Sequence, residues 1–128
     1  MTKKKDTKIT DAGGQNMAVA AARIALHDNC EDIVVLDLRG RSPVADFFVI
    51  ATGTSDRQLR SVADDLGRHG KNVGHKVWRV AGTERGDWIV LDFVDVVVHL
   101  FDTEHRHYYD LELIWGECPH VDWEAEAS

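Results

Sequence analysis

Residues 88–101, WIVLDFVDVVVHLF, decide the fold of this chain. This stretch is denser in β-branched and aromatic residues than any other part of the sequence, and it mixes them regularly with charged side chains. Alternation of this kind is typical of β-strands. We predict two strands, 88–93 and 96–101, joined by a turn so short that the strands must pair antiparallel.

The two strands have one apolar face and one mixed face, because successive side chains of a strand point in opposite directions. The apolar set is expected in the core and contains Ile89, Leu91, Phe93, Val96, Val98 and Leu100. The mixed set contains Trp88, Val90, Asp92, Val97, His99 and Phe101. If both mixed halves share a face, that face presents Trp88, Asp92 and His99 among apolar residues, which is typical of a protein-binding patch.

An alternative is that a helix of the same chain covers the mixed face, and the pattern alone leaves both interpretations open. The candidate cover is a helix predicted over residues 104–115. Its residues Tyr108, Leu111 and Trp115 lie on one stripe, and stripes with this spacing are more often core than binding site. We therefore interpret these three residues as core.

The rest of the chain supplies the other elements of an α/β domain. We predict a helix over 15–29 that stops at Asn29, strands at 33–38 and 47–52, a helix that begins after Ser55 and runs to about residue 69, and a short strand at 77–80. This order predicts a single domain with a mixed, roughly five-stranded sheet packed with helices. The expected boundaries are a mobile basic tail over 1–13, the domain over 14–119 and an acidic tail over 120–128.

The charge is unevenly distributed. The net charge is -7, while residues 1–10 carry four lysines against Asp6, or +3, so the remaining body carries -10. An acidic body argues against direct nucleic-acid binding, because phosphates must be met by cations. It suits a basic protein partner, although acidity can also serve solubility alone.

The two cysteines, Cys30 and Cys118, form no disulfide framework and have no neighbours at metal-ligand spacing. No apolar run approaches the length of a membrane span, and no apolar stretch follows the first residues. We expect a reduced cytoplasmic protein with no secretory signal, no membrane contact, no metal and no cofactor.

The junction Gly53-Thr54-Ser55 lies between a predicted strand and a predicted helix, where backbone N–H groups can hold a phosphate. Nucleotidyltransferases place Gly-Ser there but also need paired carboxylates for metal ions. Asp92 and Asp95 lack the Asp-x-Asp spacing that would put both carboxylates on one face of a strand. Ser55 and Gln58 match a capping box, so we interpret the junction as a helix cap and expect no catalytic residues.

Four ordered blocks then resemble a known family. They are DFFVIATGTS at 46–55, DWIVLD at 87–92, DVVVHLF at 95–101 and RHYYDLE at 106–112 followed by Trp115. Over about residues 16–119 the chain resembles the ribosomal silencing factor family, also called the Iojap family. The resemblance implies a nucleotidyltransferase-like fold without an active site. It also implies binding to the large ribosomal subunit through its fourteenth protein, which blocks subunit joining and represses translation when nutrients are scarce.

By the same resemblance, Trp88 is the expected interface anchor, with Asp92, Asp95 and His99 as its polar companions and no direct nucleic-acid contact required. The family commonly has Gly-Asp in the turn between the last two strands, whereas this chain has Val94-Asp95. Valine resists positive φ, so we expect a changed turn here. Two other interpretations are a nucleotide-binding or nucleotidyltransferase-like enzyme that uses residues 53–55, and a homodimeric adaptor that pairs through its apolar face.

Overall fold

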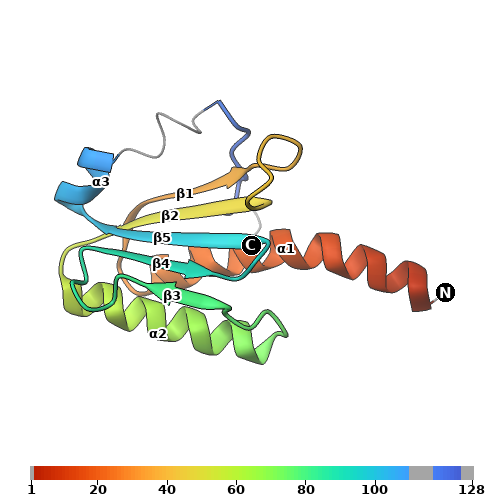
Figure 1. Ribbon diagram of the computed structural model, residues 1–128, viewed down its shortest axis with the longest axis horizontal. Helices are drawn as coiled ribbons and strands as arrows, with labels where there is room; N and C mark the ends of the chain where they lie inside the picture. Colours follow the sequence, from red (N-terminus) through yellow and green to blue (C-terminus); the bar gives the residue numbers. More distant parts are fainter. Residues whose placement is uncertain (1, 110–116, 125–128) are drawn as a thin grey trace.

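The computed structural model describes the backbone of residues 2–109 and 117–124, and the side chains of 13–106 and 117–124. A five-stranded sheet in the order β1-β2-β5-β4-β3 forms the centre of the molecule (Figure 1). Its elements are α1 (Thr2–His27), β1 (Glu31–Asp37), β2 (Phe47–Gly53), α2 (Asp56–Asn72), β3 (Arg79–Ala81), β4 (Trp88–Asp92), β5 (Val96–Asp102) and α3 (Thr103–Tyr109). Only the β2–β5 pair is parallel among these strands, so the predicted mixed five-stranded sheet is confirmed.

The hairpin of β4 and β5 pairs antiparallel, as predicted. Trp88 lies opposite Phe101, Val90 opposite His99, and Asp92 opposite Val97. Directly paired residues point to the same side of a sheet. The two mixed halves of the hairpin therefore share one face, which was the condition for a single mixed surface with Trp88, Asp92 and His99.

The sheet has a buried cluster on each face. On the first face, α1 and α2 cover the sheet, and the predicted core residues Ile89, Leu91, Phe93, Val96, Val98 and Leu100 are all buried there (Figure 1). The second face carries a smaller cluster that includes Leu36, Phe48, Ile50, Val97, Phe101 and Cys118. The predicted stripe of Tyr108, Leu111 and Trp115 lies outside the residues whose side chains are described.

Helix α1 begins at Thr2 and not at Gln15, so the basic segment predicted as a separate tail continues the helix. Gly13-Gly14 does not end the helix. Gly14 is buried, and a Cβ added there would lie 3.6 Å from the ring of Phe47, so glycine lets the helix approach the sheet closely. The predicted stop at Asn29 is confirmed, because this residue has φ 70°. The Cys30 N–H donates to the Ala25 carbonyl, and the Asn29 N–H donates to the Leu26 carbonyl. This is a Schellman cap.

The C-terminal segment, expected as an acidic tail from residue 120, packs on the sheet in its described part, which ends at residue 124. The Val121 N–H donates to the Val35 carbonyl at 2.8 Å, and the Asp37 N–H donates to the Pro119 carbonyl at 2.8 Å. Trp123 is buried in the cluster beneath α1. The segment packs because it satisfies the outer backbone groups of β1 and buries an indole. In the described part of the chain no helix is long and apolar enough to cross a membrane.

Candidate functional site

Trp88 is the first residue of β4 and lies half-buried on the second face of the sheet. Its indole N–H donates to Nδ1 of His99 at 3.2 Å, and its ring stacks on Phe101 with a centroid separation of 5.0 Å. Phe48 meets the His99 ring edge-on at 4.8 Å. The His99 and Phe101 rings of β5, with Phe48 of β2 packed against His99, therefore hold the indole in one orientation.

His99 supports Trp88 from inside the protein. It is only 8% exposed, and this burial lowers the pKa of its imidazole to about 4. The ring is therefore neutral at pH 7, and because Nδ1 accepts the indole N–H, the ring proton lies on Nε2. Nε2 is buried without a hydrogen-bond partner among the described residues. The sequence placed His99 beside Trp88 as a polar companion; the structure places it there, but beneath the surface.

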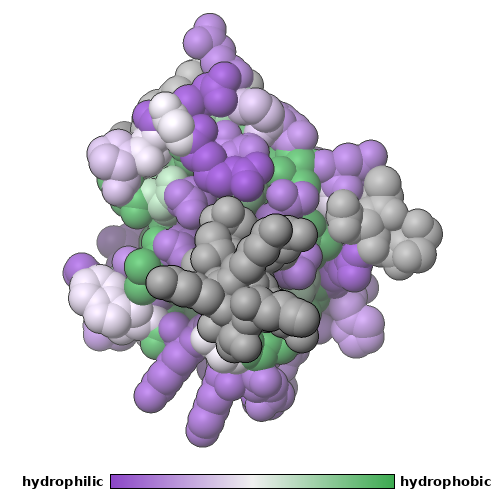
Figure 2. Space-filling view, turned by 90° about the vertical axis from the view of Figure 1, so that its right-hand side faces the viewer, coloured by the Kyte–Doolittle hydropathy of each residue, from purple (hydrophilic) through white to green (hydrophobic). Residues whose placement is uncertain are grey.

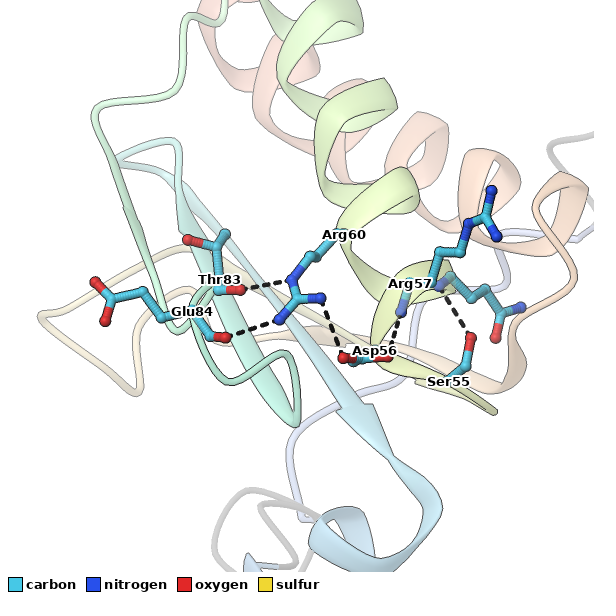
Figure 3. A network of polar contacts seen from close by, with 7 residues as sticks. Ser55, Asp56, Arg57, Arg60, Thr83 and Glu84 are labelled. Atoms are coloured by element: carbon cyan, nitrogen blue, oxygen red, sulfur yellow. Dashed lines mark hydrogen bonds and ion pairs between the residues drawn. The ribbon is translucent and has the colours of Figure 1, made fainter.

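The loop before Trp88 is fastened to α2 by one arginine (Figure 3). Arg60 donates from Nε to the Thr83 carbonyl at 2.7 Å, from one terminal nitrogen to the Glu84 carbonyl at 2.7 Å, and from the other to the Asp56 carboxylate at 3.1 Å. Gly82 has φ +88°, and an added Cβ would collide with the Trp88 carbonyl. The backbone that leads into Trp88 is therefore held in place independently of the contacts of the Trp88 side chain.

A histidine between two carboxylates closes the same end of the sheet. Asp102 accepts the backbone N–H of His105 at 2.8 Å, which caps α3, and the same oxygen lies 2.7 Å from His105 Nδ1. His105 Nε2 lies 3.3 Å from the Asp87 carboxylate. The hydrogen bond to Asp102, with the charges of Asp102 and Asp87, raises the pKa of His105. Both ring nitrogens can donate only in the protonated form, so the imidazolium fits this position best.

Asp92 lies at the opposite end of β4, about 13 Å from Trp88 at the usual rise of about 3.3 Å per strand residue. Its Oδ1 accepts the backbone N–H of Val94 at 2.7 Å. Val94 has φ +79°, a conformation that valine resists and that this turn nevertheless requires of it. Two hydrogen bonds keep the turn tight despite the strain. One is the bond from the Val94 N–H to the Asp92 side chain, and the other runs from the Phe93 N–H to the Val96 carbonyl at 2.8 Å.

Four residues surround a shallow cavity of about 320 Å³ beside this turn: Val44, Trp78, Asp92 and Val94. Trp78 is 70% exposed, Val44 70% and Val94 59%. They belong to the β1–β2, α2–β3 and β4–β5 connections, which meet at one end of the sheet. Figure 2 faces this end and shows hydrophobic residues reaching a mainly hydrophilic surface in small patches. The prediction missed Trp78 as a site residue; the signal was its place between charged Lys76 and Arg79 in the strand predicted over 77–80, which is too short to be central, and in the structure Trp78 lies just before β3.

Asp95 is not brought together with the other predicted site residues. A Cβ added at Gly14 of α1 would lie 4.0 Å from the Cβ of Asp95, which places this side chain toward the helix-covered side. Its backbone carbonyl accepts the N–H groups of Asp46 and Phe47 at 2.8 and 3.0 Å. The four predicted residues thus occupy three places: Trp88 with His99, Asp92 at the cavity, and Asp95 beside α1.

The junction of residues 53–55 is a helix cap, as interpreted from the sequence. Ser55 Oγ accepts the Gln58 N–H at 3.0 Å, and Gln58 Oε1 accepts the Thr54 N–H at 2.6 Å. The protein's own side chains therefore use donors that a phosphate would need. Asp92 lies across from the start of β2, and Gly53 ends this strand about 20 Å away, so Asp92 cannot serve chemistry at the junction.

Comparison with known proteins adds the family. Residues 11–128 match the family described as "Ribosomal silencing factor during starvation". The chain belongs to the ribosomal silencing factor family. The match extends beyond residue 119 to the acidic end, which had been placed outside the resemblance.

Relatives of this ribosomal silencing factor chain include bacterial and animal proteins. It is 39% identical over 98 residues to "Ribosomal silencing factor RsfS" of Halalkalibacterium halodurans, covering 77% of this chain and 84% of the relative. It is 33% identical over 91 residues to the mouse "Mitochondrial assembly of ribosomal large subunit protein 1", covering 69% and 40%. A crystal structure of a Chromobacterium violaceum protein aligns with a TM-score of 0.76 at 31% identity, covering 80% and 85%. The bacterial relative's name describes a silencing factor and not an enzyme.

Proposed function

We propose that this protein binds the large ribosomal subunit through the subunit's fourteenth protein, blocks joining of the small subunit and so represses translation under nutrient limitation. The observation that carries the proposal is the family match over residues 11–128, which includes every block of the sequence resemblance. The names of the relatives, a silencing factor and a protein of large-subunit assembly, support a ribosomal partner. The mechanism is steric occlusion and requires no catalysis.

Trp88 is the proposed anchor of the interface. A tryptophan held in one orientation loses little rotational freedom on binding, and partly buried aromatic residues dominate interface energies. His99 contributes through Trp88, because it accepts the indole N–H from beneath. Asp92 and Asp95 are proposed as polar contacts at the other end of the hairpin.

The charge of the chain supports a basic partner. Its net charge is -7, so a positively charged ribosomal protein would be attracted before contact, with no nucleic-acid contact required. Attraction of this kind is screened by salt, because the Debye length falls to about 3 Å at 1 M ionic strength. We expect the association rate with the subunit to fall as salt rises, in the cytoplasmic setting proposed for this protein.

Co-sedimentation with purified large subunits tests the function. The wild-type protein is expected in the subunit pellet, and light scattering should show that it slows joining when small subunits are added. Trp88→Phe should weaken binding while it keeps the stacking on Phe101. Leu26→Ala is the control, because Leu26 is an exposed apolar residue of α1, away from the hairpin. Absence of the wild-type protein from the pellet would overturn the function, and unchanged binding by Trp88→Phe and Trp88→Ala would overturn the site.

A further inference from the structure

The cavity beside the β4–β5 turn has a composition that the fold does not require. Val44, Trp78 and Val94 are each more than half exposed, yet they converge on one carboxylate, Asp92. Single exposed apolar side chains are ordinary on protein surfaces. Three of them around a carboxylate form a surface that would suit a group with both an apolar part and a positive charge.

The carboxylate of Asp92 has no cationic partner among the side chains that the structure describes. Its hydrogen bond to the Val94 N–H uses part of a capacity of about four acceptor positions. Arg79 is its cross-strand neighbour in register, but the two form no ion pair, and no other cation pairs with Asp92 among the described residues. The charge therefore remains available to a positively charged group from outside.

Val94 adds a second observation. A β-branched residue at positive φ is strained, and glycine or asparagine would form the same turn with less strain. Val94 is 59% exposed, so its methyl groups gain little burial within the protein. They instead line the cavity beside Trp78. An exposed side chain held in a strained conformation indicates a recognition role.

We propose that this cavity binds a lysine or arginine side chain of a protein partner. The aliphatic stem would pack on Val44 and Val94, while the cation would lie against the face of Trp78 and pair with Asp92. The inference rests on the proposed function only in naming the large ribosomal subunit as the source of that side chain. It adds a second contact about 13 Å along β4 from Trp88.

The first test needs no ribosome. NMR spectra of the full chain are recorded with N-acetyl-arginine amide, N-acetyl-lysine amide and the uncharged N-acetyl-norleucine amide. The cationic compounds should shift the Trp78 indole and the Val44 and Val94 methyl signals, with millimolar affinity, and norleucine amide should not. Asp92→Asn removes the charge but retains an oxygen for the Val94 N–H, and should weaken binding about fivefold. Equal shifts with norleucine amide would overturn the cationic preference.

The second test uses purified large subunits. Asp92→Asn and Trp78→Ala should each weaken subunit binding about fivefold. Val73→Ala is the matched control, because Val73 is an exposed valine of the same α2–β3 connection outside the cavity. Unchanged subunit binding by both variants, with no cation-dependent NMR shifts, would overturn the inference. Cation-dependent shifts in a protein that does not bind subunits would support the cavity assignment and overturn the proposed function.

Discussion

The two ends of β4 carry side chains on the same face of the sheet, but the protein treats them differently. At the Trp88 end, the indole N–H, the carbonyls of the preceding loop and the cap of α3 all have partners within the chain. At the Asp92 end, a carboxylate that pairs with no cation in the described part of the chain lies among exposed apolar side chains beside a strained turn. The Trp88 end of β4 therefore stabilises the fold, whereas the Asp92 end carries groups that a binding partner could contact.

This difference separates two ways of preparing an interface. Trp88 is preorganised, so contact with a partner requires little further ordering. The Asp92 cavity presents a carboxylate and exposed apolar side chains, so a partner would supply the cation and the apolar contact. Substitutions at the Trp88 end should therefore lower the stability of the fold as well as binding, whereas substitutions at the Asp92 end should lower binding with little effect on stability.

The largest expected effect is an acid-induced loss of stability at the Trp88 end. Burial lowers the pKa of His99 to about 4 from its ordinary 6.5. The unfolded chain therefore binds a proton first, and the stability present above pH 6.5 falls as the pH decreases toward 4. The full shift corresponds to about 3 kcal/mol. Urea unfolding across this range should show the loss in the wild type and not in His99→Gln, and parallel pH profiles would contradict the assignment.

Next in size is a comparison of the same substitution at two tryptophans. Trp88→Ala should lower the free energy of unfolding by about 2 kcal/mol, less than a fully buried tryptophan because Trp88 is half-buried. Trp78→Ala should change it by less than about 0.5 kcal/mol, because Trp78 is exposed. Chemical unfolding of both variants measures the difference. Similar losses would show that the two ends of the hairpin do not differ as described.

Val94→Gly should stabilise the protein by about 0.5–1 kcal/mol, because relief of strain exceeds the entropy that glycine adds to the unfolded chain. Val94→Asn is a useful companion, since asparagine adopts positive φ readily. Thermal unfolding gives the stability, and subunit binding should weaken in the same variants. Lower stability of both variants would show that Val94 is not strained.

The smallest effect concerns His105, beside the loop that leads to Trp88. NMR titration should give His105 a pKa above 6.5. The contribution of His105 to the free energy of unfolding is therefore fully present below pH 6.5 and is lost as the pH rises through the pKa of the folded state. Asp102→Asn should lower this pKa more than Asp87→Asn, because the hydrogen bond to Asp102 is the main cause. An equal response to both substitutions would contradict that order.

Most of the fold could be predicted from local pattern. The alternation of Ile89 and Leu91 with Trp88 and Val90 specified the two faces of the sheet, because the strand period is fixed by backbone geometry. The helix cap at Ser55 and the stop at Asn29 depend on neighbouring residues and were equally visible. Gly13-Gly14 misled the prediction, since a glycine that ends a helix and one that packs on a ring look alike in sequence.

The candidate site was predicted less completely. Trp88 and His99 were placed together correctly because they lie on paired strands. The cavity could not be predicted, because Val44, Trp78 and Val94 come from three connections that only the tertiary structure brings together. The place of Asp95 beside α1 could not be predicted either, because Asp95 follows Val94 in the turn and the strand period does not set its direction.

The C-terminal segment along β1 limits how this sheet can grow. Its bonds to Val35 and Asp37 occupy the outer side of β1, whereas β3 lies at the opposite edge with all three of its residues exposed. Strand addition between copies of the described domain is therefore opposed at residues 35–37 of β1, whereas β3 presents an exposed edge. Two copies joined through β3 would each turn this bonded part of β1 outward, which would oppose further growth of the sheet from there.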